Sequence, residues 1–157
     1  MAPEPARTVV DMSLPYPRPS SPAASAVMKA NRKTGTTPEV RLRSLLHRRG
    51  LRYRKNYLVR SGDLAVRVDI VFPRQRLAVF VDGCFWHRCP RHGTTPRTNP
   101  DYWLPKLSRN VARDERVTRA LETSGWQVLR IWEHIAPEEA SAQVVAALAA
   151  RTSAGLV

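Results

Sequence analysis

Apolar residues follow two different periodicities along this chain. In three stretches they recur every three or four positions, as on one face of a helix, and in four shorter stretches they alternate or run without interruption, as in strands. The predicted helices cover about 37–49, 102–124 and 137–151, and the predicted strands cover 51–59, 64–72, 77–82 and 126–132. The order αβββαβα predicts an α/β fold in which a mixed sheet is flanked by helices.

Local signals support the limits of these elements. Thr37 precedes Pro38 and Glu39, which is the usual order of an N-cap, a first-turn proline and an acidic residue at a helix start. Gly50 and Gly125 stand where left-handed C-terminal caps are expected. Both predicted helices therefore have a physical reason to end where their apolar period ends.

The first 26 residues differ in composition from the rest of the chain. They are rich in Pro, Ala and Ser and have no apolar period, which predicts a disordered tail. We expect a tail over 1–28, one folded domain over 29–151 and a short C-terminal tail over 152–157. No apolar run approaches the roughly 20 residues that cross a bilayer, and the start lacks the apolar core of a secretion signal. The expected location is the cytoplasm.

The chain is strongly basic, with 26 Lys and Arg against 13 Asp and Glu, a net charge of +13 and a pI near 11.1. Such a charge favours a polyanionic partner, and nucleic acid is the leading hypothesis. The alternative is a solvated basic surface without a dedicated partner.

The two cysteines stand close to histidines. Cys84, Cys89 and His92 fall within nine residues, and His134 follows the last predicted strand. Sulfur and imidazole ligands in a set of four favour tetrahedral Zn²⁺, and a set filled by protein ligands makes a structural site. His87 could replace either histidine in this set. The alternative is that the cysteines are simply buried and the histidines exposed.

Asp69 lies between apolar neighbours within a predicted strand, and the next strand ends at Asp82. An ionised carboxylate in such a position needs a partner that offsets its lost hydration. Carboxylates and backbone carbonyls at adjacent strand ends form a hard oxygen site suited to Mg²⁺. Alternatively, Asp69 lies at a sheet edge or pairs with Arg67.

The run Gly83-Cys84-Phe85-Trp86-His87 resembles the signature of the Vsr (very short patch repair) endonucleases, and the resemblance extends from about residue 29 to 134. Further matches in the same order are Thr37-Pro38-Glu39, Leu45-Leu46, Val68 to Phe72, Asp101-Tyr102-Trp103, Lys106, Asn110, Arg113-Asp114, Gly125 to Leu129 and Trp132-Glu133. The resemblance implies a restriction-endonuclease-like fold. It also implies Mg²⁺-dependent nicking of duplex DNA on the 5′ side of the thymine in a T:G mismatch left by deamination of 5-methylcytosine.

The resemblance also implies roles for single residues. Asp69 would bind the catalytic metal together with the main-chain carbonyl of Val81, and His87 would be the catalytic histidine that takes a proton from water. Glu39 would order metal-bound water, and Asp114 would support the histidine. Without the resemblance, Glu39 reads as a charge that suits a helix start, and Asp114 as a solvated charge.

Contacts to DNA follow from the same resemblance. Phe85, Trp86 and Trp103 match aromatic residues that wedge into the base stack beside the mismatch, where flat side chains replace lost stacking. The alternative is that they are core aromatics. Four basic residues are then expected to contact phosphates: Arg91, Arg97, Lys106 and Arg109.

The sequence departs from the family pattern at several positions. Asp82 stands where better-known members carry a histidine, so it either joins the Mg²⁺ shell or changes how the phosphate is held. Val81 offers no side-chain oxygen, and His134 replaces the usual final cysteine. Two other functions stay open: a restriction-like or defence nuclease acting on other DNA, and a zinc-stabilised DNA-binding module without catalysis. The family pattern further suggests a monomer and a functional link to a DNA cytosine methyltransferase.

Overall fold

The computed structural model describes residues 34–155 together with residues 18, 21–23, 25 and 26. Its main elements are α2 (Thr37–Arg48), β1 (Arg54–Ser61), β2 (Leu64–Phe72), β3 (Leu77–Asp82), α3 (Pro100–Thr123), β4 (Gln127–Trp132) and α4 (Pro137–Ala154). Their order and type confirm the αβββαβα prediction. Most of the predicted tail over 1–28 lies outside the described residues. Within the described part of the chain, no helix is both long and apolar enough to span a membrane.

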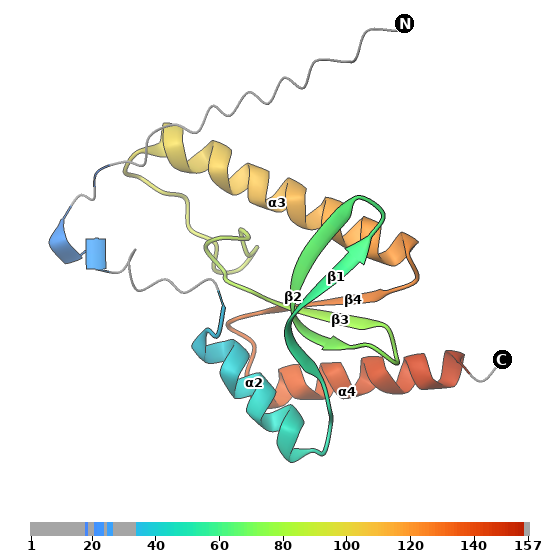
Figure 1. Cartoon of the computed structure of the whole chain (residues 1–157). Helices are drawn as coiled ribbons and strands as arrows, with labels where there is room; N and C mark the ends of the chain where they lie inside the picture. The colour runs from blue at the N-terminus through green and yellow to red at the C-terminus, as the bar shows by residue number, and fades with distance from the viewer. Residues whose placement is uncertain (1–17, 19–20, 24, 27–33, 156–157) are drawn as a thin grey trace, which may run out of the picture.

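The four strands form one mixed sheet in the order β1-β2-β3-β4. β1 and β2 form an antiparallel hairpin, β3 runs antiparallel to β2, and β4 runs parallel to β3. Parallel neighbours require a crossover, and α3 provides it between β3 and β4. In Figure 1, α3 lies along one face of the sheet, whereas α2 and α4 lie along the other.

Each face of the sheet carries its own apolar core. On one face, Leu42 and Leu46 of α2 and Val144 of α4 pack against strand residues such as Leu77. On the other face, side chains of α3, with Leu121 fully buried, pack against β2 and β3. The helical and strand periodicities of the sequence therefore correspond to real buried stripes.

The alternation of β2 breaks at Asp69. Val68 and Ile70 are two positions apart and both 0% exposed, so ordinary strand geometry would place them on the same face. Instead Val68 belongs to the core beneath α3, whereas Ile70 belongs to the core beneath α2 and α4. The pairing of β2 with β3 begins only at Ile70. Asp69 thus occupies the point where the two strands separate.

Element ends follow the predicted caps with small shifts. Gly50 and Gly125 adopt left-handed conformations, with φ of +77° and +83°, as predicted. The N-cap of α2 is Thr36 rather than Thr37, so Pro38 occupies the second helical position. α4 continues to Ala154, three residues beyond the predicted end, because no helix-breaking residue occurs before Gly155.

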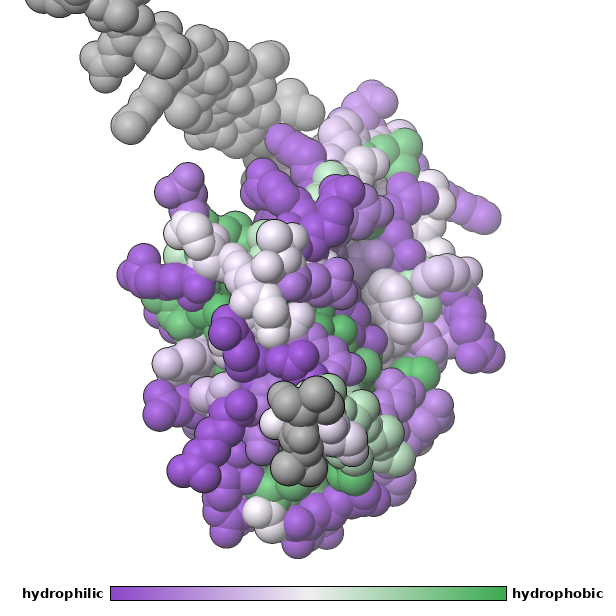
Figure 2. All heavy atoms as spheres, turned by 90° about the vertical axis from the view of Figure 1, so that its right-hand side faces the viewer, coloured by the Kyte–Doolittle hydropathy of each residue, from purple (hydrophilic) through white to green (hydrophobic). Residues whose placement is uncertain are grey.

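The surface has few exposed apolar side chains. Figure 2 views the end of the molecule at which α4 finishes, and hydrophilic residues cover most of it, with apolar residues in small separate patches. Among the described residues, the large hydrophobic side chains that are exposed are Val40 and Val145. This surface favours polar or charged partners over an apolar docking face.

Candidate active site

The predicted site residues gather at the end of the sheet where β3 and β4 finish. A loop over residues 83–99 leaves β3 here and leads to α3, and α2 begins on the same side of the molecule (Figure 1). The backbone N–H of His87 donates to the carbonyl of Gly83 at 3.1 Å, which closes the first turn of this loop. The turn brings His87 back against the sheet.

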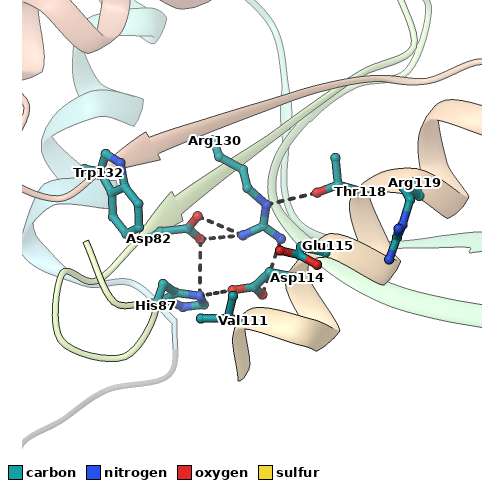
Figure 3. A pocket seen from close by; sticks show the side chains of 9 residues that line it. All are labelled: Asp82, His87, Val111, Asp114, Glu115, Thr118, Arg119, Arg130 and Trp132. Atoms are coloured by element: carbon teal, nitrogen blue, oxygen red, sulfur yellow. Dashed lines mark hydrogen bonds and ion pairs between the residues drawn. The ribbon is translucent and has the colours of Figure 1, made fainter. Parts of the chain in front are cut away.

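His87 is held by a carboxylate from a distant part of the chain. Its Nδ1 forms a hydrogen bond with Oδ2 of Asp114 on α3, shown in Figure 3. An ionised carboxylate only accepts hydrogen bonds, so Nδ1 carries the proton, and Nε2 is the ring nitrogen left for other partners. Burial alone would raise the pKa of Asp114, but the His87 hydrogen bond and the charge of Arg130 outweigh it and lower that pKa. Asp114 is therefore an ionised partner rather than a solvated surface charge.

Arg130 of β4 joins the two carboxylates around His87. Its Nη1 donates to both carboxylate oxygens of Asp82, at 2.9 and 2.8 Å, and its Nη2 lies 3.4 Å from Oδ1 of Asp114. Sequence reasoning assigned Arg130 no role. The available signal was a charged residue between Leu129 and Ile131 in an apolar strand, which is the same signal that identified Asp69.

These side chains border a hollow of about 370 Å³ between the sheet and α3. Figure 3 shows Asp82 and Arg130 reaching into it from the strands, with His87 and Asp114 below them. The hollow lies on the face of the sheet that α3 covers. The hydrogen-bonded network of Asp82, Arg130, Asp114 and His87 therefore lies on the α3 side of the sheet.

Asp69 approaches the same end of the sheet from β2. Its Oδ2 accepts a hydrogen bond of 2.9 Å from the backbone N–H of Val81, at the point where the backbone pairing of β2 and β3 has stopped. Burial raises the pKa of Asp69 to about 6, the Val81 hydrogen bond opposes this shift, and the charges of Glu39 and Asp82 add to it. Neither alternative for Asp69 holds, because β2 is an inner strand and Arg67 donates to the carbonyl of Asn56 instead.

Glu39 is buried at the start of α2, with 3% of its surface exposed. Its Oε2 accepts a hydrogen bond of 2.8 Å from the backbone N–H of Gly35. Its Oε1 lies 3.1 Å from the Arg43 guanidinium but has no hydrogen bond of acceptable geometry. A charge that only suited the helix dipole would not need burial, so the dipole explanation is incomplete.

The carboxylates fit a divalent cation that keeps several of its own waters. Asp69 and Glu39 carry negative charge into one buried region, and one Glu39 oxygen there has no hydrogen bond. Mg²⁺ is usually bound through one or two carboxylates plus water, so these two carboxylates are compatible with such an ion. Both oxygens of Asp82 are already bonded to Arg130, so a place for Asp82 in the Mg²⁺ shell stays a prediction that this geometry does not favour.

The four predicted zinc ligands lie together. The ligand atoms of Cys84, Cys89, His92 and His134 are all within 4.8 Å of one another. Nδ1 of His134 is 3.2 Å from Sγ of Cys84 and 3.7 Å from Sγ of Cys89. The edge of a tetrahedral Zn²⁺ site with sulfur and nitrogen ligands is roughly 3.5 Å, so this cluster fits such an ion. His87 is instead occupied with Asp114, which does not favour it as a replacement ligand.

The pKa shifts of two residues in the Cys/His cluster are compatible with a bound cation. Burial lowers the pKa of His134, and the nearby His92 and Arg91 lower it further, so the ring is neutral and able to bind a cation. Burial raises the pKa of the Cys84 thiol to about 11, and Cys89 adds to this shift. A bound cation would oppose that rise and favour the thiolate.

The turn that carries Cys89 depends on Gly93. Its N–H donates to the Cys89 carbonyl at 2.7 Å, and a Cβ at Gly93 would lie 2.5 Å from that oxygen. Gly93→Ala should therefore displace Cys89, lower the melting temperature and reduce bound metal, as thermal melting and elemental analysis would measure. Gly155→Ala is the control, because its Cβ would meet only ordinary contacts. Full metal content in Gly93→Ala would contradict this account of the turn.

The predicted wedge residues form one aromatic cluster. The Phe85 ring is 5.1 Å from Trp86 and 5.8 Å from Trp103, and Trp86 and Trp103 are 5.8 Å apart. Trp103 is only 7% exposed, whereas Phe85 and Trp86 are partly exposed. Asn110 of α3 donates to the Trp86 carbonyl at 3.2 Å and ties the loop to the helix. In this arrangement Trp103 supports the other two rings from beneath.

The four predicted phosphate contacts flank this cluster in sequence. Arg91 and Arg97 lie exposed on the loop, and Arg109 lies exposed on α3. The ammonium of Lys106 lies 5.9 Å from the Trp86 ring and 5.4 Å from the Trp103 ring. Lys106 thus contributes to the packing of the aromatic cluster as well as to its charge.

A helix-flanked mixed sheet with a histidine–carboxylate pair beside a buried aspartate suits an enzyme that hydrolyses phosphodiesters. Residues 20–91 match the family model described as DNA mismatch endonuclease Vsr. The chain belongs to the Vsr family and is a DNA endonuclease.

Several relatives share most of the chain. It is 52% identical over 141 residues to the type II nicking enzyme V.NaeI of Lentzea aerocolonigenes, covering 89% of this chain and 85% of that protein. It is 45% identical to the type II nicking enzyme V.XorIIP of Xanthomonas oryzae pv. oryzae, covering 68% of this chain and 76% of the relative. It is 38% identical to the DNA mismatch endonuclease Vsr of Escherichia coli, covering 68% and 66%.

A solved structure supports the fold. The catalytic domain of the homing endonuclease I-Bth0305I superposes with a TM-score of 0.51 at 20% identity, covering 74% of this chain and 98% of that domain. At this identity the similarity concerns the fold alone. The predicted α/β endonuclease fold is confirmed.

Proposed function

We propose that this protein nicks one strand of duplex DNA on the 5′ side of the thymine in a T:G mismatch. The observation that carries the proposal is the pairing of His87 with Asp114 at the end of the sheet where Asp69 is buried. The likeness to a mismatch endonuclease of E. coli supports the choice of substrate. Mismatches of this kind arise where 5-methylcytosine loses its amino group, so a cytosine methyltransferase is the expected functional partner.

His87 is assigned as the general base. With Nδ1–H donated to Asp114, Nε2 of the neutral ring can take the proton of the attacking water. Asp114 keeps the ring in this tautomer and stabilises the imidazolium that forms. The lowered pKa of Asp114 supports this assignment, because an ionised carboxylate stabilises a cation.

Asp69 and the main-chain carbonyl of Val81 would hold Mg²⁺, and Glu39 would order one of its waters. When bound, Mg²⁺ polarises the phosphate and stabilises the leaving oxygen. The raised pKa of Asp69 supports the assignment, because a carboxylate that is costly to ionise in the apo protein is stabilised by a cation.

Recognition is assigned to the loop and to the start of α3. Phe85 and Trp86, supported by Trp103, would stack against the bases beside the mismatch, since a mismatched pair is cheaper to open than a matched one. The basic residues Arg91, Arg97, Lys106 and Arg109 would contact phosphates and set the position of the duplex.

Zn²⁺ is proposed for the cluster of Cys84, Cys89, His92 and His134. The site links the loop to the segment after β4, because His134 follows that strand and the other ligands lie on the loop. A closed set of four protein ligands leaves no position for substrate, so its role is structural. It would hold the loop backbone that carries His87, Phe85 and Trp86.

A second candidate is a nuclease that cuts DNA other than a T:G duplex, as in restriction or defence. Two relatives with high identity are named type II nicking enzymes, which favours keeping this candidate. A DNA-binding module without catalysis is not favoured, because a binding role would not need the partly buried His87–Asp114 pair.

The two candidates predict different substrate preferences. We expect nicking of a T:G duplex to exceed that of matched C:G and T:A duplexes by about tenfold or more, because opening a mismatched pair costs less. Each duplex should be tested in several flanking contexts under single-turnover conditions with Mg²⁺. Equal cutting of all three duplexes would contradict the mismatch proposal and support the second candidate.

A further inference from the structure

His87 has one Nδ1–H but two carboxylates within reach. It is bonded to Asp114, and Oδ1 of Asp82 lies only 3.9 Å from the same nitrogen. Both side chains are largely buried, with 7% of Asp82 and 16% of Asp114 exposed. A small rotation of the imidazole would exchange one partner for the other. Such a rotation would also move Nε2, which lies on the opposite part of the ring.

Arg130 forms shorter hydrogen bonds to Asp82 than to Asp114. It donates to both oxygens of Asp82 at 2.8 and 2.9 Å, but it approaches Asp114 through one nitrogen at 3.4 Å. Asp82 therefore has its strongest acceptor directions occupied, whereas Oδ2 of Asp114 remains for His87. Arg130 is in this way the residue that distinguishes the two possible partners of the histidine (Figure 3).

The guanidinium of Arg130 is itself held in place. Its Nε donates to the Thr118 hydroxyl at 3.1 Å, and its Cζ lies 4.5 Å from the centre of the Phe80 ring. Each of its three nitrogens thus faces protein groups. This arrangement suits a residue that orders its neighbours rather than one that binds a DNA phosphate.

We propose that Arg130 is a positioning residue that holds Asp82 away from His87, so that Asp114 alone orients the imidazole. The inference rests on the proposed role of His87 as the base. Without Arg130, the buried Asp82 would lack a cation and would compete for Nδ1–H of His87. The ring would then divide between two orientations, and Nε2 would be misplaced for the attacking water.

The test compares Arg130→Leu, the double variant Arg130→Leu/Asp82→Ala and the control Arg119→Leu. Arg119 lines the same hollow but makes none of these contacts. The measurements are the single-turnover nicking rate, the Kd for the same duplex, and ¹⁵N NMR of the His87 ring in full-length protein. Metal content and thermal melting verify that each variant is folded.

Arg130→Leu should slow nicking by about 100-fold, the scale expected for a misplaced reacting group, with Kd changed by less than about threefold. Its His87 ring nitrogens should shift or broaden as the ring samples Asp82. Deleting the competitor in the double variant should recover at least about tenfold of the rate and return the NMR signals toward wild type. Arg119→Leu should match wild type.

A double variant no faster than Arg130→Leu, or unchanged His87 signals in Arg130→Leu, would overturn the proposal. A parallel rise in Kd would also overturn it, because Arg130 would then be a DNA contact. The NMR measurement needs no substrate, so it tests Arg130 separately from the choice of DNA. An unchanged rate in His87→Ala would instead count against the proposed function.

Discussion

Asp69→Asn should abolish nicking and at the same time stabilise the metal-free protein at neutral pH. Asparagine has nearly the same shape and its carbonyl can still accept the Val81 N–H bond, but it carries no charge for a divalent cation. We expect the single-turnover rate to fall by about a thousandfold or more, because the metal contributes several kcal/mol to the transition state. DNA binding should be largely preserved.

The stability gain follows from the direction of the pKa shift. Burial raises the pKa of Asp69 in the folded protein to about 6, whereas an unperturbed aspartate has a pKa of 3.8. As pH rises from about 4 to 6, the unfolded chain has lost its proton while the folded chain still binds it, so wild-type stability falls across this window. Above pH 6 the penalty is complete, at roughly 2–3 kcal/mol.

Thermal melting of wild type and Asp69→Asn at pH 4 and pH 8, without added Mg²⁺, tests this pH dependence of stability. The two proteins should differ little at pH 4, and the variant should melt higher at pH 8. Added Mg²⁺ should raise the melting temperature of wild type but not of the variant. Asp63→Asn, in the exposed β1–β2 turn, is the matched control. Retained nicking in Asp69→Asn would contradict the proposed role of Asp69 in binding the catalytic cation.

His87→Ala should lower the single-turnover nicking rate by about 10²–10⁴-fold, the usual contribution of a general base. Its zinc content and melting profile should stay near wild type, because the four cluster ligands do not include His87. The truncated side chain leaves space beside Asp114, so added imidazole should restore part of the rate. These three measurements separate a base from a structural residue.

The controls for this variant use other histidines of the chain. His47→Ala, exposed on α2, should change neither rate nor metal content. His92→Ala should instead lose metal, since His92 belongs to the Cys/His cluster. Loss of metal in His87→Ala would make His87 a ligand, and a normal rate would remove it from the mechanism.

The network around His87 compensates for one departure of this chain from the family pattern, the aspartate at position 82. Asp82 takes the place of a histidine expected from the family resemblance, and a carboxylate next to Asp69 and Asp114 would add to their repulsion. The structure places Arg130 against it, so the extra negative charge is balanced locally. The two positions lie 48 residues apart, on parallel strands that α3 connects.

The sequence by itself determined the helices and strands of this protein and the grouping of cysteines and histidines in the loop after β3. Apolar spacing identifies helices and strands because each buries one face, and this requirement acts over a few neighbouring residues. The proximity of Cys84, Cys89 and His92 is likewise local. The apolar neighbours of Asp69 in its strand predicted a buried carboxylate that needs a partner, because an isolated buried charge is costly wherever the strand packs.

Only the tertiary structure decided which groups meet. The bond between His87 and Asp114, the pairing of Asp82 with Arg130 and the burial of Trp103 beneath Phe85 all join distant segments. The change of face at Asp69 also depends on where β2 leaves β3. Such contacts depend on strand register and on how α3 crosses the sheet. Local periodicity cannot predict the register or the crossing of α3, because it indicates that a side chain is buried but not which partner lies beside it.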